Sequence, residues 1–449
     1  MALDVSAMFA RLLRRPDGRS TRLQLRRAQR MAWIITVAIL AGVAAALYAR
    51  LCDQAMDLHA RAWTLAPIPT LLLLPAGFAA VVWLTRRFAP ESTGSGIPQV
   101  IAAAEQRWTG RWGGQRVTLR TAVWKVALSA ALLVCGASIG REGPTVQVAA
   151  GIVRSLTRGL KGGPGRRALI LAGGAAGVSA AFNTPIAGIV FAVEELARSF
   201  ERRAHTAVIL VVVAAGFTSY AIQGDYAYFG ELNGRSALGS AWIAAPLIGV
   251  VAGLCGGIFA RALVASTLPG ASVVADWRAR RPVVFAVICG LVAAGAALAS
   301  GGLTFGAGYG EARSLLQDHP GRGAGFALAK FVASLAAAAA GAPGGIFAPS
   351  LATGAGIGAA FARSGLAFAG RDCVVLGMTG YLAGVVQAPL TSAVILMEMT
   401  REPSLVGPLL LCALIARWSS GWVMPEPVYH ALSRPWRTPP PAGVAPEAE

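Results

Sequence analysis

Long apolar runs recur along the whole chain, separated by short polar segments. Hydrophobic residues make up 55% of the sequence and charged residues only 14%, which is too apolar for a soluble protein of 449 residues. A helix needs roughly 20 apolar residues to cross a bilayer. The alternating segments of a membrane barrel are absent, so the sequence predicts an all-α polytopic membrane protein. The predicted spans are Met31–Leu47, Pro67–Leu84, Val208–Ala221, Trp242–Ala260, Pro282–Ala299 and Leu405–Ala416.

Basic residues are concentrated before the first apolar run and in the short segments between runs. The net charge of +19 therefore does not indicate a domain that binds nucleic acid. Because positively charged flanks stay in the cytoplasm, residues 1–30 are expected there, as an amphipathic helix on the anionic inner leaflet. A transit peptide is the alternative, but Asp4 and Asp17 are acidic and no cleavage pattern follows. The arginines concerned are Arg11, Arg14, Arg15, Arg19, Arg22, Arg26, Arg27 and Arg30.

The tail at residues 434–449 carries Arg434 and Arg437 and is also expected in the cytoplasm. The number of crossings is then even, and we expect no regulatory domain after the membrane domain.

The cysteines and histidines are scattered without paired spacing, so neither disulfides nor a metal site is predicted. No cofactor is expected. The cysteines are Cys52, Cys135, Cys255, Cys289, Cys373 and Cys412.

The membrane domain, residues 31–433, contains a repeat. Residues Gly173, Pro185, Val190 and Glu194 match residues that lie 204 positions later, namely Gly377, Pro389, Val394 and Glu398. We predict two halves, about 31–230 and 241–433, joined by a polar loop near Gly230–Ser240. Coincidence among Ala- and Gly-rich helices is the alternative. Duplicated halves broken by Gly and Pro are typical of secondary transporters, and each half needs an odd number of segments, so an inverted repeat is expected.

Three segments share one design, in which glycine or another small residue precedes a proline and a helix. Proline is favoured in the first helical turn, so each segment is predicted to start a helix inside the membrane. A helix amino terminus offers unpaired N–H groups and a partial positive charge. Three such ends aimed at one point bind an anion without a full charge, and weakly enough to release it. The segments are Gly94, Ser95, Gly96, Ile97 and Pro98; Gly140, Arg141, Glu142, Gly143 and Pro144; and Gly345, Ile346, Phe347, Ala348 and Pro349.

The second of these segments also carries an ionisable carboxylate. A charge at membrane depth costs at least ~2.5–3.5 kcal/mol, so Glu142 marks a functional site by default. The alternative is an Arg141–Glu142 ion pair that only supports a loop. Ser95 offers a hydroxyl donor, or else is an ordinary helix cap. The Phe347 side chain is expected to be a wall beside backbone donors.

The three segments together resemble the selectivity-filter motifs of the CLC family of chloride channels and chloride/proton exchangers. The resemblance extends from about Met31 to Ser433 and includes Phe182-Asn183-Thr184-Pro185 before Glu194-Glu195, and Tyr429. It implies that chloride is bound by the hydroxyls of Ser95 and Tyr429 and the backbone of Ile346 and Phe347. From the residue alone, Tyr429 is equally an interfacial belt tyrosine. Gln99 departs from the family, where glutamate is common, and Lys125 matches a buried lysine of the exchangers.

The same resemblance makes Glu142 the gating glutamate. Ionised, its carboxylate would occupy the anion site and block it; protonated, it would swing away, which couples protons to chloride. The match for the internal proton-transfer residue of exchangers falls on Glu195, whose alternative is a surface salt bridge to Arg198 or Arg202. Glu194 is expected to be structural. We therefore predict a chloride/proton antiporter, with a passive voltage- or pH-gated chloride channel as the alternative. Fluoride exporters usually lack the serine at Ser95.

Other classes of protein fit the sequence poorly. An intramembrane enzyme would need a nucleophile–base pair or metal ligands in the spans, and no such pattern exists. The run from Gly354 to Gly358 loosely resembles a dinucleotide fingerprint, but it follows no strand and indicates close helix packing.

The resemblance to the CLC family further implies a homodimer in a bacterial inner membrane. The expected contact surfaces are Ile186–Leu196, Val208–Tyr220, Thr391–Met399 and Leu405–Trp418.

Overall fold

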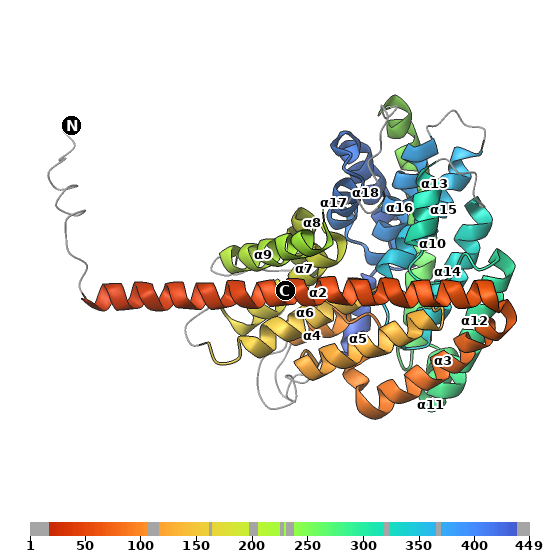
Figure 1. The fold of residues 1–449 in the computed structure, drawn as a ribbon. Coiled ribbons are helices and arrows are strands. Elements are labelled where there is room, and N and C mark those ends of the chain that lie inside the picture. Colours follow the sequence, from red (N-terminus) through yellow and green to blue (C-terminus); the bar gives the residue numbers. More distant parts are fainter. Residues whose placement is uncertain are drawn as a thin grey trace.

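The computed structural model describes residues 18–105, 116–160, 164–196, 205–224, 229, 238–317, 323–364 and 370–437. These residues form helices joined by short turns, with no strand among them (Figure 1). The longer helices are α2 (Gly18–Leu65), α3 (Pro67–Phe88), α5 (Leu119–Val134), α6 (Glu142–Leu156), α7 (Arg166–Phe182), α9 (His205–Gln223), α10 (Leu238–Thr267), α12 (Pro282–Ser300), α14 (Gly323–Ala339), α15 (Phe347–Ala362), α16 (Gly370–Val386), α17 (Pro389–Thr400) and α18 (Val406–Val423). The shorter ones are α4 (Ile97–Glu105), α8 (Pro185–Phe191), a π-helix (Ala192–Leu196), α11 (Val273–Arg280), α13 (Tyr309–Leu316) and α19 (Val428–Ser433).

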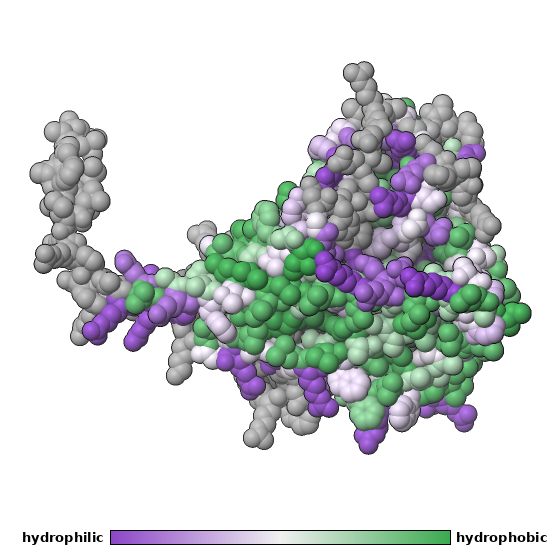
Figure 2. All heavy atoms as spheres, in the orientation of Figure 1, coloured by the Kyte–Doolittle hydropathy of each residue, from purple (hydrophilic) through white to green (hydrophobic). Residues whose placement is uncertain are grey.

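Six helices in the described part of the chain are long and apolar enough to cross a membrane. Each contains one of the predicted spans, so the hydropathy reading is confirmed helix by helix. Figure 2 shows a broad hydrophobic area on one face of the molecule, with hydrophilic residues along its lower edge. That distribution is the one expected of a surface that contacts lipid.

The amino-terminal helix α2 is continuous from Gly18 to Leu65 and extends beyond the rest of the body (Figure 1). Residues 18–30 are therefore the first part of the same helix as the first span, and not a separate helix. Arg22, Arg26 and Arg27 are exposed on it. Residues 1–17 of the expected amphipathic segment, and most of the expected loop near Gly230–Ser240, lie outside the described residues.

The helices of the two halves correspond. Shifting α7 by 204 positions gives the bounds of α16, and both helices have 17 residues. The same shift carries Asn183 to Gln387, and both have a left-handed backbone, with φ of 59° and 63°. Each then precedes a helix that begins at a proline, α8 or α17. The repeat thus extends to backbone conformation, while the inverted orientation of the halves stays a prediction.

Small residues let the helices around the centre approach closely. A side chain at Gly354 of α15 would lie 2.4 Å from the Gly377 carbonyl of α16, and one at Gly358 would lie 2.1 Å from the Cys373 carbonyl. Such contacts leave no space for a Cβ atom, which is the usual reason for glycine between membrane helices. The Gly354–Gly358 run is therefore a packing motif, as the sequence indicated.

Candidate anion pathway

The three glycine-and-proline segments meet in the structure. Gly140 and Gly345 exchange two backbone hydrogen bonds, of 2.8 and 2.9 Å. The Gly344 amide donates to the Gly94 carbonyl at 3.1 Å, which brings in the first segment. Helices α4, α6 and α15 begin directly after these contacts. Three helix amino termini therefore start around one point, as the sequence predicted.

Ser95 and Tyr429 lie together at the end of a cavity, and both are buried. Neither hydroxyl has a well-formed hydrogen-bond partner among the described residues. Ser95 lies close enough to act on the Tyr429 hydroxyl, and two adjacent buried hydroxyls without a further partner indicate a site for a polar ligand. The alternative in which Tyr429 is a tyrosine of the interfacial aromatic belt is wrong, because its side chain is 0% exposed. The helix-cap reading of Ser95 also fails, because the serine hydroxyl caps no described amide.

This inner cavity has a volume of about 400 Å³ and is bordered by Ile346 as well as by Ser95 and Tyr429. Two arginines also line it, Arg86 at the end of α3 and Arg278 of α11. Burial lowers the pKa of the Arg278 guanidinium from its usual value, but an arginine stays protonated in proteins. Fixed positive charges at the mouth of such a cavity attract anions toward it.

Phe347 forms one wall next to this site. Its ring stacks on Tyr429 at 5.9 Å and meets Phe182 and Phe191 edge-on. The side chain is 1% exposed, so it packs inside the protein rather than against lipid. The backbone of Ile346 and Phe347 lies at the start of α15, where amides lack helical partners.

Glu142 lies in the middle of these segments, with its side chain 1% exposed. One carboxylate oxygen accepts the Tyr309 hydroxyl at 2.5 Å, and the other is 3.4 Å from the Ala348 amide in the first turn of α15. Gly140 lies so close that a Cβ there would be 2.2 Å from the second oxygen. The carboxylate therefore occupies a position that a helix amino terminus makes favourable for an anion.

Arg141 does not form a tight pair with its neighbour. Its guanidinium is 3.3 Å from Asp53 of α2 but 3.9 Å from Glu142. The alternative, in which an Arg141–Glu142 ion pair only supports the loop, does not fit these distances, because Asp53 is the closer partner of Arg141.

The paired glutamates at 194 and 195 have different surroundings. Glu194 accepts hydrogen bonds from the Leu390 and Thr391 amides in the first turn of α17, at 3.0 and 2.6 Å. This carboxylate caps a helix, which is the structural role expected of it. Glu195 belongs to the π-helix and is 2% exposed. Its charge acts on Tyr429. Arg198 and Arg202, the expected partners in the salt-bridge alternative, lie outside the described residues.

Two further side chains shape the loop that carries Ser95. The Lys125 amine is fully buried and donates to the Ser92 and Gly94 carbonyls, each at 2.6 Å. Gln99 donates to the Thr93 carbonyl at 2.6 Å. The amide of Gln99 thus has a structural task in this chain that a carboxylate, which only accepts, could not perform.

Tyr309 and the loop before it were not predicted from the sequence. In this loop, Gly306, Ala307, Gly308 and Tyr309 correspond to Gly94, Ser95, Gly96 and Ile97 at a spacing of 212 positions. The glycines at both places have positive φ, 64° and 101° in the first loop and 61° and 85° in the second. Lys330 donates to the Thr304 and Gly306 carbonyls, as Lys125 does to Ser92 and Gly94. The signal in the sequence was therefore a second lysine within an apolar run, 205 positions after the first.

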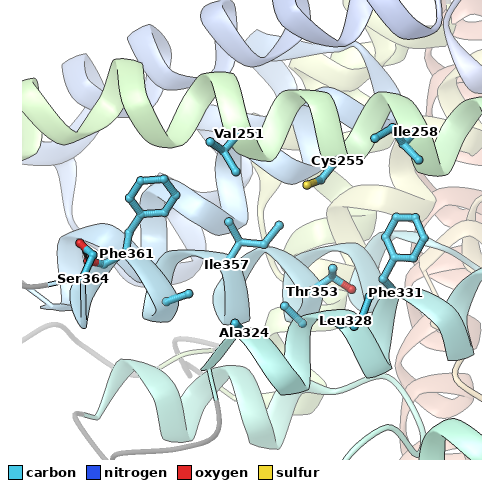
Figure 3. Close-up of a pocket in the computed structure, with 12 residues that line it drawn as sticks. Val251, Cys255, Ile258, Ala324, Leu328, Phe331, Thr353, Ile357, Phe361 and Ser364 are labelled. Carbon is cyan, nitrogen blue, oxygen red and sulfur yellow. Dashed lines mark hydrogen bonds between the residues drawn. The ribbon is translucent and has the colours of Figure 1, made fainter.

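A separate cavity of about 490 Å³ lies between α10, α14 and α15 (Figure 3). Its walls are almost entirely apolar, with Val251, Ile258, Leu328, Ile357 and Phe361 pointing into it. Such a lining offers an anion no charge and few donors. The cavity bordered by Ser95 and Tyr429 is therefore the better candidate for an anion pathway.

Comparison with known proteins identifies relatives that transport chloride. Residues 76–421 match the sequence family described as voltage gated chloride channel. The chain is 32% identical over 400 residues to the H(+)/Cl(-) exchange transporter ClcA of Yersinia pestis, covering 82% of this chain and 77% of the relative. Against ClcA of Citrobacter koseri it is 30% identical over 402 residues, with 84% and 80% covered.

Solved structures share the fold. A slow cyanobacterial Cl-/H+ antiporter has a TM-score of 0.72 at 26% identity, covering 90% of this chain and 97% of that one. A CLC-type fluoride/proton antiporter also has a TM-score of 0.72, at 20% identity, with 88% and 96% covered. The second likeness is one of fold alone. The chain has the all-helical, multi-span architecture that these proteins share.

Proposed function

Because the chain belongs to the voltage-gated chloride channel family, a family of membrane transporters and not of enzymes, we propose that it exchanges chloride for protons. The observation that carries this proposal is the Glu142 carboxylate, buried at the start of α6 and facing the first turn of α15. A titratable anion at that point competes with chloride for the same helix ends. Proton binding and chloride occupancy are then linked by thermodynamic necessity.

The chloride site in this proposal consists of the Ser95 and Tyr429 hydroxyls and the Ile346 and Phe347 backbone amides. The two unsatisfied hydroxyls support it. Partial charges of this kind hold an anion loosely enough to let it leave. Chloride would enter from the inner cavity, past Arg86 and Arg278.

Glu142 acts as the gate and as the outer proton acceptor. Ionised, its carboxylate takes the place of a chloride ion and closes the path. Protonated, it no longer competes for the positive helix ends, so the side chain leaves and chloride enters. Glu195, which is buried and whose charge acts on Tyr429, passes protons to and from the cytoplasm. The clustering of acidic groups of this kind inside a membrane protein is typical of proton relays.

A passive chloride channel and a fluoride/proton antiporter are the competing functions. The buried Glu195 favours exchange over a channel, since a channel has no need of a second proton station. Ser95 and the resemblance to chloride/proton exchangers favour chloride over fluoride.

We further propose a homodimer in a bacterial inner membrane with both termini in the cytoplasm. Exposed apolar side chains on the expected contact helices support the dimer, namely Ile186, Val193, Ile209, Phe217, Leu390, Leu414 and Trp418.

The deciding experiment uses the purified protein in liposomes. Given a chloride gradient and no proton gradient, the exchanger should drive protons uphill, as read by a pH electrode. Glu142→Gln should stop proton movement and leave a chloride flux that no longer depends on pH, because the gate cannot ionise. Chloride flux in the natural protein without any uphill proton movement would establish the channel instead. Fluoride flux that greatly exceeds chloride flux would identify a fluoride transporter.

A further inference from the structure

We infer that Tyr309 is the latch of the Glu142 gate: its hydroxyl fixes the carboxylate in the blocking position and so sets the pH at which the pathway opens. The inference rests on the proposed gating role of Glu142. It starts from the 2.5 Å hydrogen bond that joins the Tyr309 hydroxyl to the carboxylate. No sequence motif suggested this contact.

The tyrosine is held in position by its own surroundings. It is the first residue of α13, directly after Gly308, whose φ of 85° turns the chain into the helix. The Lys330 amine anchors the preceding loop through two carbonyls, at 2.9 and 2.7 Å. The Tyr309 ring also packs against Phe229, with ring centres 6.0 Å apart. A donor fixed in this way loses little conformational entropy when it binds the carboxylate.

Besides the Glu142 backbone amide, the two oxygens of Glu142 face two donors from the second half of the chain. Oε1 meets the Tyr309 hydroxyl, and Oε2 faces the Ala348 amide at the longer distance of 3.4 Å. The shorter contact is the stronger one, and a hydrogen bond to a charged acceptor is stronger than one between neutral groups. Tyr309 therefore holds the ionised, closed state more firmly than the Ala348 amide does.

Other charged or titratable groups also act on Glu142. Arg141 lies 3.9 Å away and is paired with Asp53. Tyr48 and Cys52 of α2, and Tyr429 of α19, interact with it electrostatically. These groups act at longer range than the 2.5 Å contact of Tyr309. Arg141 is the stronger electrostatic influence among the charged groups, and Tyr309 is the closest hydrogen-bond donor, so the pH response of the gate should change when the Tyr309 hydroxyl is removed.

The test is Tyr309→Phe, which removes the hydroxyl and keeps the ring against Phe229. Chloride efflux from liposomes is measured over a series of pH values. Without the donor the ionised carboxylate is less stable, so the half-maximal pH should move upward by about one unit or more, a tenfold change in proton binding. The control is Tyr381→Phe, because the Tyr381 hydroxyl is buried without a hydrogen-bond partner among the described residues. Its pH profile should match that of the natural protein.

The same substitution is then made together with Glu142→Gln. If Tyr309 acts through the carboxylate, Tyr309→Phe should have no further effect on the pH profile in that background. An unchanged profile for Tyr309→Phe alone, or an equal shift in both backgrounds, would overturn the latch. The failure of proton exchange looks different: the natural protein would move chloride without protons, while Tyr309→Phe would still shift the pH of chloride flux.

Discussion

At the scale of single residues, the carboxylates are distinguished by their partners. Glu194 and Glu398 each accept two backbone amides at the start of a helix, so their charges are satisfied by structure. Glu142 and Glu195 are almost completely buried near the chloride-site candidates. Buried ionisable groups inside a membrane protein are the ones expected to titrate during a transport cycle.

For Glu195, the expected result of Glu195→Gln is loss of proton movement with chloride movement retained. An amide has nearly the same shape but cannot carry a proton in exchange. The measurement compares proton and chloride flux in the same liposome preparation. The matched control is Glu194→Gln, which changes the adjacent cap and should leave the coupling intact. Normal coupling in Glu195→Gln would return this residue to a structural role.

Most residues of the candidate site could be found from the sequence, and the reason is physical. Glycine, proline and a charge inside apolar segments are costly, so Gly140–Pro144 stands out from the residues around it in the sequence itself. Tyr309 carried no such signal, because a tyrosine after glycines is common at membrane interfaces. Its loop also lacks the proline of the other segments, with Gly310 in the place that Pro98 has in the first loop.

At the scale of elements, the six longest helices were predictable from hydropathy, whereas shorter helices were predicted only where a glycine-and-proline segment marks their start. Hydropathy over about 20 residues detects a span, and all six spans were found in this way. Helices such as α4, α8 and α13 are too short to give that signal. Helix α13 packs against α15 and α16 of its own half, whereas α8 is positioned in part by contacts with α17 of the other half.

One set of such contacts is reciprocal. Glu194 of the first half caps α17 of the second, and Glu398 of α17 caps α8 of the first through the Ile186 and Ala187 amides, at 3.2 and 2.6 Å. Each short helix therefore depends on a carboxylate from the other half. Caps of this kind typically contribute about 1 kcal/mol or more.

Removing one cap should destabilise the protein without altering the pathway. Glu398→Ala is expected to lower the free energy of unfolding by about 1–3 kcal/mol, because two amides lose a charged acceptor. Thermal unfolding in detergent measures the change. Glu402→Ala, at a partly exposed glutamate beyond the end of α17, is the control: its carboxylate accepts the Ser404 hydroxyl but caps no helix of the other half, so its loss should have less effect. Equal melting temperatures for both variants would contradict the capping role.

At the scale of the whole molecule, the surface of α9 and α18 is notably apolar. Phe217 is 60% exposed and Trp418 62% exposed in the single chain. Large aromatic side chains on a membrane protein face either lipid or a second protein. The proposed homodimer would cover this surface, while each subunit would keep its own pathway.

The dimer can be tested with two matched substitutions. Trp418→Glu should convert the protein from dimer to monomer in detergent, because a charge would be buried between subunits. Trp83→Glu changes a tryptophan of similar exposure on α3, away from the proposed interface, and should leave the dimer intact. Light scattering after gel filtration gives the mass of each. Dimeric Trp418→Glu would place the contact surface elsewhere.

The reciprocal caps and the paired hydrogen bonds between Gly140 and Gly345 bear on how the two halves of the protein depend on each other. Half a chain on its own would leave its short helix uncapped and its central glycine loop unmatched. Two identical half-length chains would satisfy each other in the same manner. The present molecule is thus organised as two half-length units that complete each other within one chain, and the two units differ at matching positions, with the carboxylate of Glu142 in one and the ring of Phe347 in the other.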